Sequence, residues 1–318
     1  MSPAPNRDLI YGGIEAGGTK FVCLVGSGPS SILAQTRIEV TEPDETIAAA
    51  SDFFAAAETG GRPILAIGIG SFGPVELRKN HPKFGWITNT PKPGWRDTNL
   101  VGAIRSAFDV PVGFDTDVNA AALAEGRWGA ARGLDSYIYL TLGTGIGGGA
   151  VVDGRLVRGL GHPEMGHIAV PRREGDQFDG ICPFHGDCLE GMASGPALAA
   201  RFGQRAETLS GADAAMATEI VAHYLAAGAR TLIYTLAPER IVVGGGLGSM
   251  RGLMDAARSR LARELAGYPG LEEHDAADML MPAGLGGKAG PLGTLILAEQ
   301  AFSRSRESSR RRGPRFQS

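Results

Sequence analysis

The sequence predicts an α/β protein made of two similar halves. Each half begins with a strand, a glycine-rich turn and a second strand, at residues 9–26 and 137–152. Each half then alternates helices with strands, and the continuous apolar run at 64–70 is typical of a buried parallel strand. Such self-similarity indicates an internal duplication. Two similar α/β halves imply a cleft between them, where we expect a ligand to bind.

Length and composition exclude several classes of protein. The 318 residues suffice for two domains, and an apolar content of 43% supports real hydrophobic cores. A net charge of -3 argues against non-specific binding of nucleic acid. No apolar run is long enough to span a membrane, and the N-terminus lacks the apolar core of a signal peptide. We therefore expect a cytoplasmic protein that has no membrane or nucleic-acid partner.

The first half combines an antiparallel meander with helices and parallel strands. Asp97 is expected to cap the second helix, and residues 74–96 have the proline and glycine content of a long irregular segment. The pattern predicts strands at 9–14, 21–26, 32–40, 64–70 and 110–115, and helices at 43–58 and 118–131. The helix that Asp97 is expected to cap carries Leu100, Ile104 and Phe108.

The second half follows the same plan. Asp153-Gly154 is a hairpin signal, and Ser194 with Pro196 predicts the start of a helix. The further pattern predicts strands at 137–143 and 149–152, a strand followed by a glycine turn within 240–248, and helices at 212–236, from about Met250, and at 292–302. We expect an N-terminal domain at 1–117, onto which the helix at 292–302 packs back, a C-terminal domain at 118–291, and a disordered basic tail at 303–318.

Residues 159–191 crowd together the side chains that bind soft metals. The chain has six histidines and three cysteines, and five of these nine lie between 162 and 188. Cys182, His185 and Cys188 are spaced by two residues, and His167 lies upstream, which gives a two-thiolate, two-imidazole set suited to tetrahedral Zn²⁺. Such a zinc is structural, because no position is left for water. The alternatives are buried cysteines with solvated histidines, or a disulfide, which the absence of a signal peptide disfavours.

Three glycine-rich turns predict phosphate binding. They are EAGGTK (15–20), LGTGIGGG (142–149) and VVGGGLG (242–248). Glycine lets backbone N–H groups approach an anion, so two turns could hold a polyphosphate while the third follows an adenosine. Any one turn alone could simply close a hairpin. The GxGxxG matches at 143–148 and 68–73 do not predict a dinucleotide site, because a hairpin pattern and Pro74 follow them instead of a helix.

The motif Asp115-Thr116-Asp117 follows a strand and begins a helix near the junction of the halves. Asp117 could be a helix cap. It could also be a general base that accepts the proton of a sugar hydroxyl as that hydroxyl attacks a γ-phosphoryl group, with Mg²⁺ neutralising the phosphates.

These motifs together resemble the ROK family of sugar kinases and repressors, and most of all its bacterial fructokinase branch. The resemblance covers the chain from residue 9 to about 300. It is carried by IEAGGTK (14–20), IGSFGP (69–74), TPKPGW (90–95), DTDVNAAALAEGRWGA (115–130), LTLGTGIGGG (140–149), GHPEMGH (161–167) and CPFHGDCLEG (182–191).

The resemblance implies an actin-like (ribonuclease H-like) ATPase fold with ATP and Mg²⁺ in the cleft. It implies that Asp117 is the catalytic base. The implied ATP-binding residues are Glu15, Gly17, Gly18, Thr19, Lys20, Gly143, Thr144, Gly145, Gly147, Gly148, Gly244, Gly245 and Gly246. The implied sugar-binding residues are Thr116, Asp117, Glu164, His167 and Glu190, and the implied zinc ligands are His167, Cys182, His185 and Cys188.

Three departures from the wider family bear on the substrate. Glu15 stands where most sugar kinases of this fold carry Asp, a feature of the fructokinase branch, and His185 stands where many relatives have a third cysteine. Thr116 replaces the Asn of glucokinase-like members, which removes two side-chain donors and favours a sugar other than glucose.

The sequence thus predicts an ATP-dependent hexose kinase that phosphorylates D-fructose at O6. Mannose, glucose or an amino sugar are alternative acceptors, because every hexose shares the 6-hydroxyl. A sugar-sensing regulator is a second class, disfavoured because the first phosphate turn at residue 15 leaves no room for a helix-turn-helix domain. An NAD-dependent oxidoreductase is disfavoured by the context of the GxGxxG matches. By analogy with related kinases we expect a homodimer.

Overall fold

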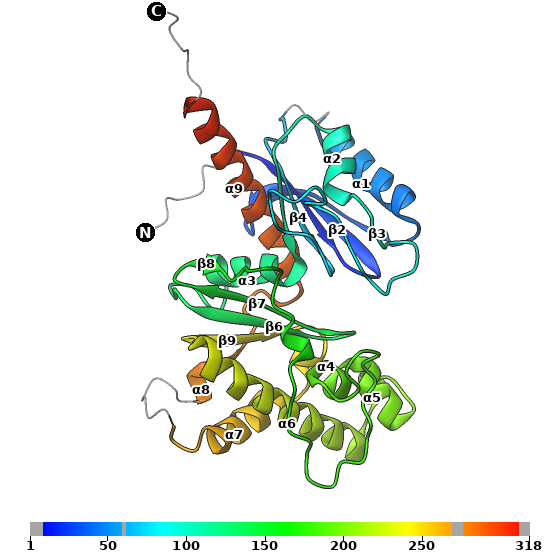
Figure 1. Cartoon of the computed structure of the whole chain (residues 1–318), viewed down its shortest axis with the longest axis vertical. Helices are drawn as coiled ribbons and strands as arrows, with labels where there is room; N and C mark the ends of the chain where they lie inside the picture. The colour runs from blue at the N-terminus through cyan, green and yellow to red at the C-terminus, as the bar shows by residue number, and fades with distance from the viewer. Residues whose placement is uncertain (1–8, 59–61, 269–275, 312–318) are drawn as a thin grey trace, which may run out of the picture. The chain divides into compact units, whose positions relative to one another are not determined.

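The computed structural model describes residues 9–58, 62–268 and 276–311 (Figure 1). Within these residues the chain forms two compact units. The first unit draws on Met1–Ala124, Arg158–His162 and Lys288–Ser318, and the second on Glu125–Val157 and Pro163–Gly287. The changes of unit at 124/125 and 287/288 lie several residues from the domain boundaries expected at 117 and 291.

The first unit contains a mixed five-stranded sheet in the order β3-β2-β1-β4-β5 among the described residues. Its strands are β1 (Tyr11–Ala16), β2 (Lys20–Gly28), β3 (Ser31–Glu39), β4 (Ile67–Ser71) and β5 (Val112–Thr116). The strands β1 to β3 pair antiparallel, whereas β4 and β5 run parallel to β1. The predicted meander and the predicted buried parallel strand are both confirmed.

Helices cover both faces of this sheet. They are α1 (Pro43–Glu58), α2 (Leu100–Ala107) and α9 (Ala289–Arg311). A Cβ on Gly12 would lie 3.0 Å from Phe54 of α1, and a Cβ on Gly13 would lie 2.0 Å from Thr294 of α9. Because successive strand residues face opposite sides, α1 and α9 cover opposite faces of the sheet (Figure 1). The C-terminal helix therefore completes the core of the first unit.

The second unit repeats the same strand order. Its five strands lie in the order β10-β9-β6-β7-β8 within the described residues. They are β6 (Tyr137–Leu142), β7 (Ile146–Val152), β8 (Arg155–Leu156), β9 (Arg240–Gly244) and β10 (Leu280–Pro282). Again the first three form an antiparallel meander and the last two run parallel to the first. The two sheets therefore share one topology, as an internal duplication predicts.

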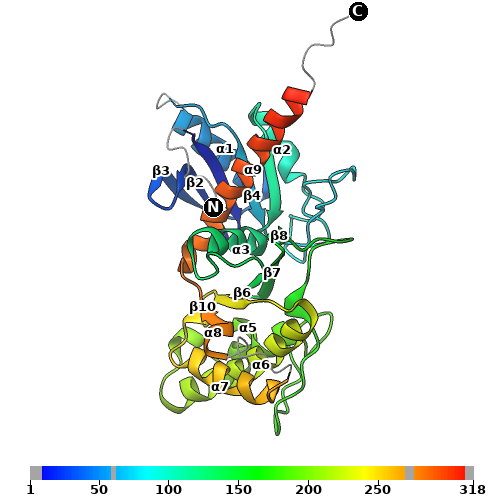
Figure 2. The same cartoon turned by 90° about the vertical axis from the view of Figure 1, so that its left-hand side faces the viewer.

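The helices of the second unit pack mainly around α6, which carries twelve buried residues and contacts α4 and α7. Figure 2 shows α5, α6, α7 and α8 gathered below β6. The helices are α4 (Leu189–Ala193), α5 (Gly195–Phe202), α6 (Gly211–Leu236), α7 (Leu253–Leu265) and α8 (Ala276–Met279), while α3 (Asp117–Trp128) crosses from the first unit into the second. Ser194 caps α5 as predicted, since its Oγ accepts a hydrogen bond from the N–H of Ala197.

Three details differ from the sequence prediction. The cap of α2 is Asn99, whose side chain accepts from Gly102 N–H, whereas Asp97 adopts a left-handed conformation with φ 56°. The strand β7 begins at Ile146, so the second glycine-rich turn is shorter than expected. Helix α9 continues to Arg311, so 303–311 are helical where a disordered tail was expected, and 312–318 lie outside the described residues. None of the helices in the described ranges has both the length and the apolar character to span a bilayer.

Candidate functional site

The first glycine-rich turn joins β1 to β2 in the first unit. The N–H of Gly17 donates to the carbonyl of Lys20 at 3.0 Å, which closes the turn. A Cβ on Gly18 would meet no atom within 4 Å, so this residue has open space beside it. Thr19 and Lys20 are exposed. The turn thus presents backbone and side-chain donors to its surroundings, as a phosphate-binding turn requires.

Glu15 lies inside β1, beside this turn, rather than within it. Its carboxylate reaches the beginning of α9, where a Cβ on Gly290 would lie 1.8 Å from Oε1. Burial raises the pKa of Glu15 to about 7, and the negative charge of Asp117 adds to the rise, while Lys20 opposes it. Glu15 and Asp117 are therefore close enough for their charges to interact.

Asp117 is the first residue of α3 and is partly buried. The preceding Thr116 caps this helix, since its Oγ1 accepts a hydrogen bond from the N–H of Asn119 at 3.1 Å. Capping by Thr116 means that Asp117 does not have to cap the helix itself, although its Oδ1 accepts from the N–H of Val118. Asp115 is fully buried and accepts from the Asn119 amide at 2.6 Å. The motif therefore fixes the helix start on which Asp117 lies.

The second glycine-rich turn comprises Gly143, Thr144 and Gly145. The N–H of Gly143 donates to the carbonyl of Gly145, and the N–H of Gly195 donates to the carbonyl of Gly143 at 2.7 Å. The first residue of α5 therefore lies against this turn. Gly147 and Gly148 belong to β7 instead, and a Cβ on Gly148 would lie 2.5 Å from Met165 Sδ. Gly148 is thus needed for packing, which the sequence did not distinguish from phosphate binding.

Glu190 comes from α4 and lies against the same turn. Its Oε2 accepts a hydrogen bond from the N–H of Ile146 at 2.9 Å. A Cβ on Gly145 would lie 2.7 Å from this oxygen, so the glycine permits the approach of the carboxylate. The fold therefore places Glu190, which is predicted to bind sugar, against a turn that is predicted to bind phosphate.

The third glycine-rich turn borders an elongated hollow in the second unit. Two pockets of about 720 and 470 Å³ share Ala206, Glu207, Gly246 and Leu247, so they are continuous. We call them the α6 trough. Its other walls include Gly143 and Thr144 at one end, and Met250 with Ala256 at the other. The sequence did not reveal the apolar walls, because their residues read as ordinary helix faces.

Of the three glycines of the third turn that are predicted to bind ATP, only Gly246 lines the trough. A Cβ on Gly244 would lie 2.4 Å from the Tyr139 hydroxyl. Gly245 has φ 83°, and its Cβ would lie 2.2 Å from the carbonyl of Leu142. These two glycines are therefore required by the close packing of the turn on β6.

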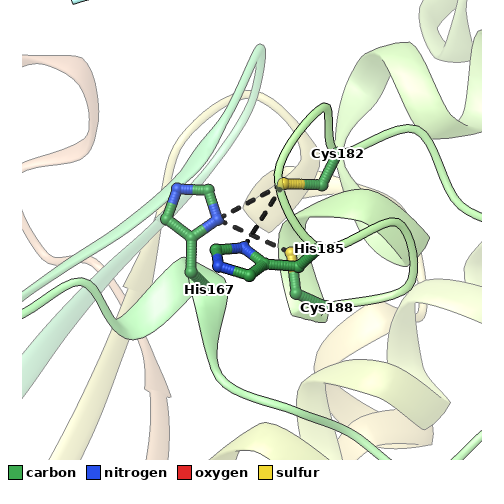
Figure 3. A group of neighbouring side chains, drawn as sticks. All are labelled: His167, Cys182, His185 and Cys188. Carbon is green, nitrogen blue, oxygen red and sulfur yellow. Dashed lines mark hydrogen bonds between the residues drawn. The ribbon is translucent and has the colours of Figure 1, made fainter. Parts of the chain in front are cut away.

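The four predicted metal ligands meet at one point of the second unit (Figure 3). The ligand atoms of His167, Cys182, His185 and Cys188 all lie within 4.8 Å of one another. Nδ1 of His167 is 3.6 Å from both sulfurs, and Nδ1 of His185 is 3.6 Å from Cys182 Sγ. The group can therefore hold a metal ion.

The backbone of the knuckle at 180–191 keeps the cysteines in place. Cys182 and Gly186 exchange two backbone hydrogen bonds, and Gly186 has φ 63°. A Cβ on Gly191 would lie 1.9 Å from the Gly186 carbonyl, so only glycine fits there. Burial raises the pKa of the Cys188 thiol to about 11, and the neighbouring Cys182 adds to the rise. A cation at this point would favour the thiolates.

A buried ion pair anchors the loop between His167 and the knuckle. Arg201 of α5 donates to both carboxylate oxygens of Asp176, at 2.8 and 2.9 Å, and the Tyr224 hydroxyl donates to Oδ2 at 2.6 Å. Glu164 is exposed, and its carbonyl accepts from the N–H of His167 at 3.0 Å. The segment that carries the ligands is thus attached to α5 and α6.

Comparisons with known proteins agree with this geometry. The model of the ROK family matches residues 11–301. The chain is 45% identical to a putative fructokinase of Bacillus subtilis (92% of this chain, 96% of the relative) and 43% identical to a fructokinase of Zymomonas mobilis (92% and 97%). It also resembles the crystal structure of a ROK family glucokinase from Streptomyces griseus in complex with glucose and AMPPNP, with TM-score 0.74 and 29% identity over 92% of this chain and 99% of the other. The fold is therefore that of the actin-like ATPases, and the chain belongs to the ROK family.

Proposed function

We propose that the chain transfers the γ-phosphoryl group of ATP to O6 of a hexose, with D-fructose as the main acceptor. Relatives named fructokinase, which are 43–45% identical over 92% of this chain, support the choice of sugar. The observation that carries the kinase chemistry is the α6 trough, which runs from a glycine-rich turn to an apolar end. A nucleotide needs both features, because its phosphates are anionic and its base is flat and largely apolar.

The triphosphate would bind at Gly143, Thr144 and Gly145. The beginning of α5 at Gly195 and Pro196 lines the same part of the trough, and a helix N-terminus favours an anion. The adenosine would then lie along Leu247 and Met250. The glucokinase relative, solved with glucose and AMPPNP, supports the pairing of a nucleotide with a hexose.

Asp117 is proposed to be the general base. Its carboxylate would accept the proton of the attacking hydroxyl, while Lys20 and the first turn bind phosphate oxygens. Mg²⁺ bound with ATP neutralises charge on the phosphates. Glu15 and Asp117 are suited to hold that ion and its waters, because a cation near both carboxylates would offset the repulsion between their negative charges.

The metal held by the knuckle is proposed to be zinc. Zn–S bonds of about 2.3 Å and Zn–N bonds of about 2.0–2.1 Å at tetrahedral angles separate sulfur from nitrogen by about 3.6 Å. The sulfur–nitrogen distances of 3.6 Å in this group agree with that value. Four protein ligands leave no position for water, so the zinc would be structural.

The knuckle would also place the sugar-binding residues. His167 faces the sulfurs through Nδ1, so its Nε2 is the nitrogen that can donate to a sugar hydroxyl. Glu190 accepts from the protein with Oε2, and its Oε1 can accept from a hydroxyl. Glu164 and Thr116 complete the proposed set. We further propose that the kinase is a cytoplasmic homodimer, and a monomeric mass by light scattering would contradict the dimer.

The test is ADP release from Mg-ATP with fructose, mannose, glucose, N-acetylmannosamine and N-acetylglucosamine in turn. Fructose should give the highest kcat/KM. Asp117→Asn should lower kcat by about 10²- to 10⁴-fold or more while fructose binding is retained, because a general base contributes that factor.

Asp97→Asn is the matched control for this substitution, since Asp97 is an exposed carboxylate that pairs with Lys83. Asn also tolerates the left-handed backbone of that position. Full activity of Asp117→Asn would exclude the mechanism. Sugar binding without turnover on any sugar, by protein that contains its metal, would favour a sugar-sensing regulator instead.

A further inference from the structure

A further pocket, in the first unit, lies among residues that the proposed chemistry does not use. Its volume is about 360 Å³, and it lies between α9, β5 and the chain around Lys79. We call it the α9 pocket. It is defined by Lys79, Arg105, Arg158, Arg304, Ser305 and Ser308.

The charged residues of the α9 pocket all have the same sign. No Asp or Glu is among its lining residues. In the described parts of the chain, no carboxylate forms an ion pair with Lys79, Arg105 or Arg304. Burial lowers the pKa of Lys79, and the positive charges of Arg304 and Arg158 lower it further. The cations are therefore close enough to repel one another, and an anion among them would relieve the repulsion.

Arg158 is held in place by a buried partner. Its guanidinium donates to Asp115, which is fully buried. A guanidinium carries five N–H donors in a planar fork, so Arg158 can bind Asp115 and an anion together. Because Asp115 fixes its position, Arg158 loses little side-chain freedom when a ligand binds.

The arrangement of α9 explains why these residues meet. Leu297, Ala301, Arg304 and Ser308 recur every three or four residues, so they lie along one face of the helix. Leu297 and Ala301 are buried, whereas Arg304 and Ser308 are exposed. The face that packs on the sheet therefore continues as a polar face that lines the pocket.

The pocket also has an aromatic wall. The rings of Phe84 and Phe114 meet edge to face, with centroids 6.1 Å apart, and both line the pocket. An inorganic ion would leave this wall unused, whereas an organic body attached to an anionic group would cover it.

We propose that the α9 pocket binds a small phosphate monoester. Arginine forks match the oxygens of a phosphate in pairs, and a monoester carries nearly two negative charges at neutral pH. The volume suits a small organic ligand. A concave pocket with an aromatic wall fits such a molecule better than it fits the extended backbone of a nucleic acid.

Isothermal titration of the full-length protein tests the proposal. Fructose and a non-hydrolysable ATP analogue are kept saturating, so that the proposed catalytic residues are occupied. The probes are a hexose 6-phosphate, inorganic phosphate and a single-stranded oligonucleotide. We expect one site for the hexose phosphate, weaker binding of inorganic phosphate, and no site-specific binding of the oligonucleotide.

The double variant Lys79→Gln, Arg304→Gln should bind the hexose phosphate about tenfold to a hundredfold more weakly, because two charge-assisted contacts are lost. Arg306→Gln, Arg310→Gln is the matched control, since it removes two charges from the same helix outside the pocket. The control should keep the wild-type affinity within about twofold. If the first double variant fails to fold, Arg105→Gln provides the comparison.

Several results would overturn the proposal. One is that the wild type does not bind the hexose phosphate, and another is that the pocket and control variants lose affinity equally. A third is that inorganic phosphate binds as tightly as the ester, and the last is that the oligonucleotide binds in place of the ester. The titration does not require turnover, and the comparison of the pocket variant with the control variant assigns the binding to the α9 pocket whether or not the chain is a kinase.

Discussion

The two units share one strand order, but the acidic side chain beside the glycine-rich turn after the first strand differs between them. In the first unit, the carboxylate beside the turn is Glu15, which belongs to the strand that enters the turn. In the second unit, the carboxylate is Glu190, which arrives from α4, far along the chain. Both units therefore have a turn at the same place in the sheet, but the carboxylate beside it comes from a strand in the first unit and from a helix in the second.

The source of the difference is the connection that follows the third strand. In the first unit only residues 40–42 separate β3 from α1. Residues 157–210 separate β8 from α6 of the second unit, apart from 158–162, which belong to the first unit, and this stretch holds the knuckle, Glu164 and Glu190. The second unit thus carries its knuckle, Glu164 and Glu190 on one long crossover that the first unit lacks after its third strand.

The largest expected effect is on the metal binding proposed for the knuckle of the second unit. Cys188→Ser should lose the metal and lower the free energy of unfolding by at least about 3 kcal/mol, since a structural zinc contributes folding energy directly. The midpoint of thermal unfolding should fall by about 10 °C. Elemental analysis and calorimetry measure the two effects, and a strong chelator should reproduce them in the wild type.

Cys23→Ala is the matched control, because Cys23 is a buried cysteine of the first unit, outside the metal group. It should retain one metal ion per chain. Equal metal content in Cys188→Ser and the wild type would contradict the assignment of the ligands.

A smaller effect is expected on the pH dependence of stability, through Glu15 of the first unit. The pKa of Glu15 is raised from 4.5 to about 7, mainly by burial. Between these values the folded state holds a proton that the unfolded state has lost, so this group's contribution to stability falls as pH rises from about 4.5 to about 7. Glu15→Gln removes the ionisable group. It should stabilise the ligand-free protein at pH 8 by roughly 1–3 kcal/mol and leave it unchanged near pH 4.5.

Urea unfolding at a series of pH values measures this difference. Glu39→Gln is the control, because Glu39 is an exposed carboxylate on the same sheet. A stabilisation by Glu15→Gln that is the same at pH 4.5 and pH 8 would mean that ionisation of Glu15 is not its cause.

The smallest effect compares one helix cap in each unit. Thr116 accepts from Asn119 N–H at 3.1 Å, and Ser194 accepts from Ala197 N–H at 3.4 Å. Thr116→Ala should lower the free energy of unfolding by about 1 kcal/mol, and Ser194→Ala should lower it by less, because its hydrogen bond is longer. Thr116→Ser keeps the hydroxyl and should recover most of the loss. Chemical unfolding resolves the three variants, and an equal loss in Thr116→Ser and Thr116→Ala would exclude capping as the cause.

The sequence predicted those parts of the molecule that depend on local pattern. Continuous apolar runs such as 64–70 predicted strands, and the crowding of histidine and cysteine predicted the ligand group. The short strand β10 and the one-turn helix α4 were missed, because three to five residues carry no clear period. The helical stretch at 303–311 was missed because its exposed residues are uniformly polar. The two roles of glycine, at Gly245 for packing and at Gly246 for the trough, could be separated only by neighbours distant in sequence.

The position of α9 has a consequence for how the protein is made. Glycines of β1, β4 and β5, at Gly13, Gly68 and Gly113, leave room on one face of the sheet for a helix that begins at residue 289. The ribosome synthesises the strands of the first unit well before it synthesises this helix. The second unit has all of its own chain before then, so it can finish folding while the first unit still has an uncovered apolar face. The first unit is therefore expected to finish folding after the second, and its apolar face needs protection from aggregation until α9 has been synthesised.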